Sequence, residues 1–420
     1  MSSEWRTTTL GDICAAQSGA IQTGPFGSQL HTSDYKESGI PVVMPTNIVE
    51  GGISDEGIAR IGEADVLRLR QHVLQYGDIV FSRRGDVTKN ALIRQREVGW
   101  LCGTGCLKVR VGTESLANPK FISHCLRQPE IKEWLVRHAV GATMPNLNTG
   151  ILAAVPLRLP PLATQREVAN VLDTLDDRIA LLRETNATLE AIAQALFKSW
   201  IVDFDPVRAK QQGLAPAGMD EATAALFPDC FDESATLLCP LGWRNGKVED
   251  LLELAYGKAL KATDRVAGDV PVYGSGGLTG FHDEPLIAGP NVIVGRKGTV
   301  GSLYWEDRPC FPIDTVFYIR PKSPLTFCFY QLAVLGLDGM NTDGAVPGLN
   351  RNNVYRLPVV IPSLSVLAAF DDLVGALRRK VFANGVQAQT LATLRDTLLP
   401  RLISGQLRLP EAHAVVEEVT

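Results

Sequence analysis

Apolar residues recur at alternating intervals of four and three positions in two long stretches, and this spacing predicts two long helices. The first apolar series runs from Val168 to Trp200 and the second from Phe370 to Leu398. More than four heptads in one register predict a coiled-coil stripe and not a general core face. The first helix is then about 50 Å long at 1.5 Å per residue. Asp203-Phe-Asp-Pro206 is expected to end the first helix and Pro400 to break the second.

The two stretches belong to a repeat that covers most of the chain. Pro145, Leu147, Asn148, Pro156 and Pro160 recur 202 residues later as Pro347, Leu349, Asn350, Pro358 and Pro362. Earlier parts of the two halves match at other offsets, with Trp5-Arg6 corresponding to Trp243-Arg244. The helices therefore align without a gap and the parts before them do not. This pattern predicts a duplicated domain in which one scaffold carries two divergent heads.

A two-fold relation between the repeats would lay the helices antiparallel, each covering the apolar stripe of the other. Asn186 falls at an a position and Asn384 at a d position. We predict that these asparagines meet and fix the register, with the axis near residues 184 and 386. The alternative is two unrelated polar interruptions. Asn384-Gly385 is also a turn signal, but the apolar register continues across it and favours one continuous helix.

The segments before each helix alternate short β-rich runs with turn residues, and they predict an α+β fold with two mixed α/β heads. Examples are the strands expected at 40–44, 77–81 and 107–111 and the amphipathic helices expected at 121–126 and 131–136. The expected division is a first head (1–158), first helix region (159–206), linker (207–240), second head (241–360), second helix region (361–408) and frayed tail (409–420).

Composition limits the cellular setting. The net charge is −5 over 420 residues, and no apolar run approaches the ~18 residues needed to span a membrane. We therefore expect a cytoplasmic protein without membrane contact. The eight cysteines are expected to stay reduced. Cys102 and Cys106 suggest zinc only weakly because no second pair completes a site, so no metal is expected.

Two loops in equivalent places carry paired cations beside a glycine: Ser82–Val87 with Arg83 and Arg84, and Gly295–Val300 with Arg296 and Lys297. The planar fork of arginine matches phosphate or the guanine edge in the major groove. The loops Gly24–Ser28 and Tyr273–Gly277 offer further amides and hydroxyls. The candidate DNA-binding residues are Ser28, Arg83, Arg84, Lys89, Arg94, Tyr273, Ser275, Arg296, Lys297 and Thr299. The competing interpretation is a solvated charged surface with ordinary turns.

Catalytic motifs are missing from the sequence. It lacks the G-x-x-x-x-G-K-[ST] phosphate loop and the Asn/Asp-Pro-Pro-aromatic loop of DNA amino-methyltransferases. Glu130-x-Lys132 resembles the end of a nuclease metal site, but no suitably placed aspartate precedes it. We therefore expect a binding protein without catalytic residues or a cofactor of its own.

Several motifs resemble those of one family, the specificity (S) subunits of type I restriction-modification systems. They are Leu159–Val168 and Leu196–Pro206 at the two ends of the first helix, Gly295–Gly301, and Pro347–Asn350. The resemblance implies two target-recognition domains that each read one half of a bipartite site in double-stranded DNA. It also implies helices that set the spacer and dock two modification (methyltransferase) subunits, which bind S-adenosylmethionine. Restriction/translocase subunits complete such a complex.

The resemblance also directs attention to partner contacts, for which the candidates are Gln165, Arg166, Phe197 and Trp200. The second helix opens with Ser363-Leu-Ser-Val-Leu367 and lacks the Gln-Arg pair, so its partner contact is expected to be weaker. The second head is less basic than the first. The alternatives are a duplicated coiled-coil scaffold that binds only protein, and a divergent nuclease or methyltransferase.

Overall fold

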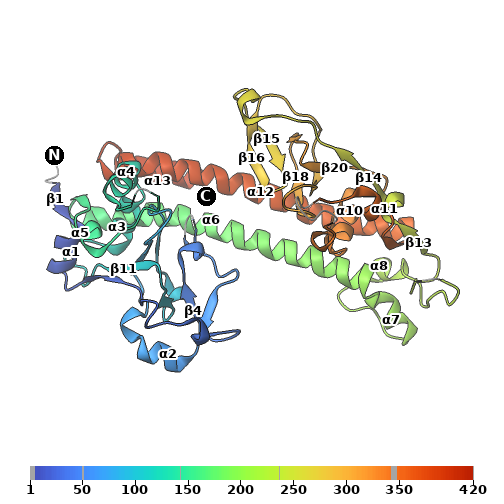
Figure 1. Ribbon diagram of the computed structural model, residues 1–420, viewed down its shortest axis with the longest axis horizontal. Coiled ribbons are helices and arrows are strands. Elements are labelled where there is room, and N and C mark those ends of the chain that lie inside the picture. Colours follow the sequence, from blue (N-terminus) through green and yellow to red (C-terminus); the bar gives the residue numbers. More distant parts are fainter. Residues whose placement is uncertain (1–4, 50–51, 142, 236, 342–347, 420) are drawn as a thin grey trace. The chain divides into compact units, whose positions relative to one another are not determined.

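The computed structural model describes residues 5–49, 52–141, 143–235, 237–341 and 348–419, so Pro347 of the repeat lies outside it. The chain forms two compact units, one of residues 1–183 with 387–420 and the other of residues 184–386. Both units contain part of the long helices α6 (Leu162–Phe197) and α12 (Leu364–Ile403), drawn in green and red in Figure 1. Each unit therefore combines residues from both halves of the sequence.

The first head is a mixed α/β domain. Its main sheet has the order β2 (Ala20–Thr23), β11 (Cys106–Arg110), β8 (Ile79–Ser82) and β9 (Asn90–Leu92). A second sheet has the order β10 (Leu101–Cys102), β4 (Ile40–Val43), β7 (Ala59–Ile61) and β3 (Tyr35–Lys36). Smaller pairs are β1 (Arg6–Thr9) with β12 (Pro156–Leu159), and β5 (Ile48–Val49) with β6 (Gly52–Ile53). The helices are α1 (Leu10–Ala16), α2 (Glu63–Arg68), α3 (Pro119–Leu126), α4 (Pro129–His138) and α5 (Thr149–Ala153).

The second head repeats this plan. Its main sheet has the order β14 (Leu252–Tyr256), β20 (Val316–Pro321), β17 (Asn291–Gly295) and β18 (Leu303–Glu306). Beside it lie β16 (Gly277–His282), β15 (Val270–Gly274) and β19 (Phe311–Pro312), and the pair β13 (Arg244–Lys247) with β21 (Pro358–Ile361). The helices are α9 (Val248–Leu251), α10 (Leu325–Ala333) and α11 (Arg351–Tyr355).

Strand register confirms the duplication. Arg6 lies opposite Leu159 in the first small pair, and Arg244 lies opposite Ile361 in the second. These residues are equivalent by the sequence offsets, so the same strand pairing closes both heads. The fold class is the expected one: two mixed α/β heads with two long antiparallel helices in a tandem repeat.

The apolar stripes of the two helices are buried as the heptad spacing predicts. In the first unit, Val168, Leu172 and Leu175 of α6 share a core with Leu391 and Leu398 of α12. In the second unit, Ala193 and Phe197 of α6, with Trp200 just after it, share a core with Phe370 and Val374 of α12. Residues with higher numbers on one helix contact residues with lower numbers on the other, which is the antiparallel arrangement.

The two seam asparagines meet as predicted. Asn384 donates a hydrogen bond from Nδ2 to Oδ1 of Asn186 at 2.9 Å, and Asn186 donates from Nδ2 to the carbonyl of Val381 at 3.0 Å. Asn384 is only 2% exposed. Helix α12 runs without a break through Gly385. The division between the two units falls at residues 184 and 387, beside the predicted crossing point.

Two expectations about the ends of the helices were wrong. Pro400 lies inside α12, which continues to Ile403, because buried Leu399, Leu402 and Ile403 hold this last turn against the core. The tail is also helical: α13 (Leu409–Val419) buries Ala412 and Val416 in the core of the first unit. The cost of one lost backbone hydrogen bond at proline is therefore offset by apolar burial.

The segment between the repeats is partly helical. After α6 the chain makes one turn of π-helix over Lys198–Val202, and Phe204 adopts a left-handed conformation with φ 58°. Helices α7 (Asp205–Gln211) and α8 (Glu221–Ala225) follow, and Phe227 is buried against the second head. Across the described ranges, every helix is too short or too polar to cross a lipid bilayer.

Candidate nucleic-acid interface

The paired cations sit at the same place in both heads. Arg83 and Arg84 follow β8, and Arg296 and Lys297 follow β17. The backbone amide of Leu147 donates to the carbonyl of Arg83 at 2.9 Å, and that of Leu349 donates to the carbonyl of Arg296 at 2.8 Å. The loop after the strand is thus held against the segment before α5 in one head and α11 in the other.

An aromatic ring lies under the first arginine of each pair. The guanidinium carbon of Arg83 is 5.9 Å from the centre of the Phe26 ring, and that of Arg296 is 4.9 Å from the centre of the Tyr256 ring. Arg351 approaches the same tyrosine at 5.0 Å. Rings at these distances attract a cation through their quadrupole and restrict its side chain. Both heads therefore hold the arginine in place without neutralising its charge.

The second head has a basic pocket of about 360 Å³ at this position. It is lined by Tyr256, Arg296, Lys297, Gly348, Leu349, Asn350, Arg351 and Asn352. The lining holds three cations and two asparagine amides, and it includes no carboxylate among the described residues. Arg296 donates to the carbonyl of Asp314 at 2.8 Å, which leaves further guanidinium donors for a ligand. Such a lining suits an anion, and phosphate in particular.

The first head presents its cations on an open surface. Arg84, Lys89 and Ser28 are exposed, and Arg83 is half-buried. Ser28 lies in a turn after β2, in the same loop as Phe26. The structure thus leaves these four candidates available to a ligand.

Arg94, by contrast, is an internal contact. Its guanidinium forms an ion pair with Asp177 of α6, and its backbone amide donates to Glu97 at 3.0 Å. Other cations between residues 83 and 110 are also engaged. Lys108 is 2% exposed and donates to the carbonyl of Gln71 at 2.8 Å, and Arg110 pairs with Asp78 at 2.6 Å. The cations between residues 83 and 110 therefore do not form one patch. Those from Arg94 onward make internal contacts that hold the head together.

The hydroxyl-bearing candidates of the second head divide in the same way. Tyr273 donates its hydroxyl to Glu306 at 2.9 Å, and burial together with that carboxylate raises the pKa of Tyr273. Ser275 uses its carbonyl to accept hydrogen bonds from Ser302 and Tyr304 at 2.7 and 3.0 Å. Thr299 is exposed. Tyr273 is therefore a structural residue, whereas Thr299 remains accessible.

Three of the four partner-binding candidates are buried within this chain. Gln165 is fully buried; its Oε1 accepts from the amide of Asn118 at 3.0 Å and its Nε2 donates to the carbonyl of Pro160 at 2.8 Å. Phe197 and Trp200 are 1% and 5% exposed in the core of the second unit. A side chain with no accessible surface cannot contact another protein directly, so these three residues support the fold.

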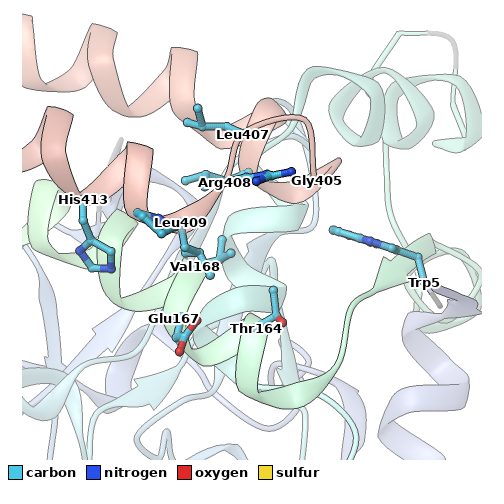
Figure 2. Close-up of a pocket in the computed structure, with 11 residues that line it drawn as sticks. Trp5, Thr164, Glu167, Val168, Gly405, Leu407, Arg408, Leu409 and His413 are labelled. Carbon is cyan, nitrogen blue, oxygen red and sulfur yellow. The ribbon is translucent and has the colours of Figure 1, made fainter. Parts of the chain in front are cut away.

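Arg166 is the exposed member of that set. Its side chain is 55% exposed and pairs with Glu114 at 2.6 Å. Beside it, an open pocket of about 600 Å³ lies between the start of α6 and the turn from α12 to α13 (Figure 2). Thr164, Glu167, Arg408 and His413 supply its polar groups, and Trp5 and Leu409 are among its apolar ones.

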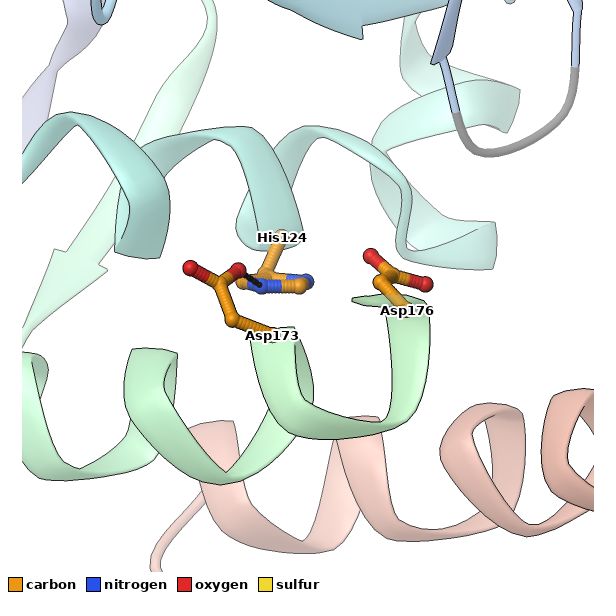
Figure 3. Close-up of side chains that lie close together, drawn as sticks. All are labelled: His124, Asp173 and Asp176. Carbon is orange, nitrogen blue, oxygen red and sulfur yellow. Dashed lines mark hydrogen bonds and ion pairs between the residues drawn. The ribbon is translucent and has the colours of Figure 1, made fainter. Parts of the chain in front are cut away.

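One buried cluster in the described part of the chain has the composition of a metal site. His124, Asp173 and Asp176 bring ligand atoms within 4.8 Å of one another (Figure 3). Lys120 pairs with Asp173 at 2.7 Å, and Arg127 and Arg395 pair with Asp176 at 2.9 and 2.7 Å. These three cations already balance the negative charge of the two carboxylates.

The histidine of this cluster is neutral. Burial, followed by the charge of Arg127, lowers the pKa of His124. Its Nδ1 lies 3.1 Å from a guanidinium nitrogen of Arg127 and must accept that hydrogen bond, so Nε2 donates to Asp173 at 2.9 Å. The cluster therefore does not fit a metal ion. It is an ion-pair network that joins α3 to the long helices.

Cys102 and Cys106 lie in the core of the first head. Both thiols are fully buried, and Cys106 donates to the carbonyl of Val43 at 3.3 Å. Burial raises the pKa of Cys102 to about 12. Among the described residues, neither cysteine belongs to a group of three possible metal ligands.

Sequence reasoning missed Arg351, Tyr256 and Phe26. Arg351 directly follows the repeated Leu349-Asn350 and was visible as a cation beside a repeated motif. The two aromatic rings gave no such signal, although Phe26 lies in the candidate loop Gly24–Ser28, because their proximity to the arginines depends on the sheet order. Arg351 completes the pocket that Arg296 and Lys297 begin.

Comparison with known proteins agrees with this arrangement. The family model described as type I restriction modification DNA specificity domain matches residues 2–191 and 240–368. Over 355 residues the chain is 25% identical to the type I restriction enzyme HindI specificity subunit of Haemophilus influenzae, covering 69% of this chain and 77% of that protein. It is 22% identical over 319 residues to the MjaIX specificity subunit of Methanocaldococcus jannaschii, covering 70% of each.

A solved structure shares the fold. The S subunit of a type I restriction-modification system from M. genitalium superposes with a TM-score of 0.55 at 18% identity, covering 96% of each chain. The family match spans both halves of the repeat, including both loops with paired cations. The chain belongs to the family of type I restriction-modification DNA specificity subunits.

Proposed function

We propose that each head of this DNA sequence-recognition subunit reads one half of a bipartite target through the loop that follows β8 or β17. The observation that carries the proposal is the recurrence of one arrangement in both heads. In each, an arginine held over an aromatic ring is followed by a second, exposed cation. Equivalent cationic loops on heads that otherwise differ suit one kind of ligand, double-stranded DNA, that each head reads at a different sequence.

The proposed DNA contacts in the first head are Ser28, Arg83, Arg84 and Lys89, and in the second head Arg296, Lys297, Thr299 and Arg351. Arginine and lysine bind backbone phosphates and, through the arginine fork, guanine O6 and N7. Ser275 stays a proposed contact only through its own hydroxyl, because its carbonyl is engaged. Arg94 and Tyr273 are left out because their polar groups bind within the head.

The rest of the assembly belongs to the same proposal. Two modification subunits would supply the adenine methyltransferase site and bind S-adenosylmethionine, and restriction/translocase subunits would complete the complex in the cytoplasm. This chain would hold no cofactor and no catalytic residue. Arg166 is the proposed contact to a modification subunit, since its side chain is 55% exposed near the start of α6.

The salt dependence of DNA binding separates this proposal from a scaffold that binds only protein. Neutralised phosphates release counterions, so each phosphate contact adds about −0.9 to the slope of log K against log salt. The proposed contacts include six cations, so several phosphate contacts are expected, and the affinity of the purified chain for duplex DNA should fall steeply between low and moderate salt. A flat, weak response would favour the scaffold.

A further inference from the structure

Two ion pairs join the long helices, one of them buried and the other half-buried. In the first unit, Asp176 of α6 pairs with Arg395 of α12 at 2.7 Å, with side chains 2% and 7% exposed. In the second unit, Glu190 of α6 pairs with Arg378 of α12 at 2.6 Å, with side chains 29% and 12% exposed. The first helix supplies both carboxylates and the second helix supplies both guanidinium groups.

Each pair is held by its surroundings. Arg378 lies over the rings of Trp305 and Phe329, at 4.5 and 5.2 Å from their centres, and Tyr330 donates to Glu190 at 3.2 Å. Asp176 has a second partner in Arg127 of its own head at 2.9 Å. These contacts fix where each charge lies. If a substitution placed a like charge opposite one of these residues, the two groups could not separate without disrupting these contacts.

The repeat places opposite charges at one equivalent position. Asp176 and Arg378 are 202 residues apart, so they occupy equivalent positions in the two halves of the repeat. If two first helices paired in this same geometry, Asp176 of one copy would take the place of Arg378 and face Glu190 of the other. If two second helices paired, Arg378 would take the place of Asp176 and face Arg395.

The seam asparagines follow the same rule. Asn384 is equivalent to Leu182, and Asn186 is equivalent to Ala388, again by 202 residues. A pair of first helices would therefore set Asn186 against Leu182, and a pair of second helices would set Asn384 against Ala388. The hydrogen bond between the two asparagines exists only when the helices differ. A buried amide that faces an apolar side chain is left unsatisfied.

We propose that the two halves of this chain are built to pair with each other and to reject a copy of themselves. The first helix, with Asp176, Asn186 and Glu190, fits a helix that presents Arg378, Asn384 and Arg395. Like charges at both alternative pairings oppose identical partners, as the flanking charges of coiled coils do. The consequence is that the two long helices of one chain pair with each other and do not join two chains. The inference concerns pairing alone and does not rest on DNA binding.

One charge reversal in each helix should invert this preference in the full chain. In Glu190→Arg/Arg395→Glu, the new cation faces Arg378 and the new carboxylate faces Asp176 within the chain. In a dimer that pairs like helices, the new cation would instead face Asp176 of the second copy, and the new carboxylate would face its Arg378. We expect the wild type to have the mass of one chain by light scattering. The variant should shift toward twice that mass and melt at a lower temperature.

Two further variants serve as controls. Glu184→Arg makes the same charge change at an exposed position of the same helix and should keep the mass and melting temperature of the wild type. The variant Glu190→Arg/Arg378→Glu keeps opposite charges within the chain and should keep the mass of one chain. A dimer that simply exchanged helices between chains would still pair unlike helices, so Glu190→Arg/Arg395→Glu gives it no advantage.

The proposal is overturned if Glu190→Arg/Arg395→Glu keeps the mass of one chain, as Glu184→Arg does. It is equally overturned if Glu190→Arg/Arg378→Glu also dimerises or unfolds. If Glu190→Arg/Arg395→Glu is insoluble while Glu190→Arg/Arg378→Glu behaves as the wild type, the proposal is supported, because the two variants share Glu190→Arg and differ in whether like charges face each other within the chain.

Discussion

Single residues decide which of the cations in this chain remain free for a ligand. Lys108 and Arg94 carry the same charge as Lys89 and Arg84, yet the first two are used to hold the head together. Charge and spacing alone did not separate the two groups, because the difference depends on contacts with residues distant in sequence, Gln71 for Lys108 and Asp177 for Arg94. The equivalent pair Arg83 and Arg296 was predictable because it recurs in both heads.

Arg351 tests the basic pocket of the second head. Arg351→Gln should weaken binding to cognate DNA about tenfold, or ~1.4 kcal/mol. If the contact is to phosphate, the slope of log K against log salt should become less steep by about 1. Binding to unrelated DNA should then weaken equally. Titration at several salt concentrations measures both.

The matched control for this prediction is Arg320→Gln. Arg320 lies on the same head with a side chain 62% exposed and is paired with Glu253. Its loss should leave DNA affinity within about twofold of the wild type. Equal losses in the two variants would mean that general charge, and not the pocket, binds DNA.

Neighbouring Gln165 and Arg166 have opposite expected roles. Gln165→Ala removes three hydrogen bonds from buried backbone groups and should lower the free energy of unfolding by about 1–3 kcal/mol. Arg166→Glu should leave stability within ~0.5 kcal/mol and reduce co-purification with a modification subunit. Denaturant unfolding and a pull-down measure the two effects. The assignment fails if Arg166→Glu is the less stable variant or if co-purification is unchanged.

At the scale of elements, the heptad pattern predicted most of the architecture. It located both helices, their buried stripes and the contact of Asn186 with Asn384, because each depends only on periodicity and on the 202-residue offset. It failed at Pro400 and in the tail. There the local signal for a break is outweighed by burial of Leu402, Ile403 and Ala412 against distant residues, which sequence alone does not show.

Gly385 gives a test of helix continuity. It is exposed in α12, and a β-carbon added there would have open space around it. Gly385→Ala should therefore raise the free energy of unfolding by about 0.5–1 kcal/mol, since alanine restricts the unfolded chain and favours helix. A destabilised variant in denaturant titration would indicate a turn at Asn384-Gly385.

The ion-pair network of Figure 3 predicts loss of stability in acid. Burial favours the neutral form of Asp176, but Arg127 and Arg395 outweigh it and lower its pKa from 3.8 to about 2. A folded pKa below the unfolded one adds stability above pH ~4 that disappears as the pH falls through about 2. This linkage is worth on the order of 2 kcal/mol.

Asp176→Asn isolates that contribution. The variant should be less stable than the wild type at pH 7 by about 3–5 kcal/mol, because Arg395 loses its buried partner. Its stability should also fall less than that of the wild type between pH 4 and pH 2. Urea titrations at several pH values measure both, and parallel curves for the two proteins would rule out this role.

At the scale of the whole molecule, two heads that differ are carried by helices that match. The globular parts could be predicted only as mixed α/β domains, because their loops diverge and the pairing of their strands is non-local. The composition of the two compact units was also beyond sequence reasoning. Each includes a helix segment from the other half of the chain, and heptads alone do not say which head a segment covers.

The helices should set the distance between the half-sites. Deleting one heptad from both would shorten the pair by ~10 Å, or about 3 base pairs at 3.4 Å each. We expect a spacer shorter by about that amount with both half-sites unchanged, read from sites selected in a random-sequence DNA pool. An unchanged spacer would contradict the claim that the helices set the distance between the half-sites.

The most direct test of the central claim is to co-express this chain with its candidate modification subunit and map modified adenines across a genome by single-molecule sequencing. Two heads that each read a half-site predict one bipartite motif with a fixed spacer. Methylation at a single uninterrupted motif, or a stable complex whose methylation pattern does not change when Arg83 or Arg296 is replaced, would contradict the account.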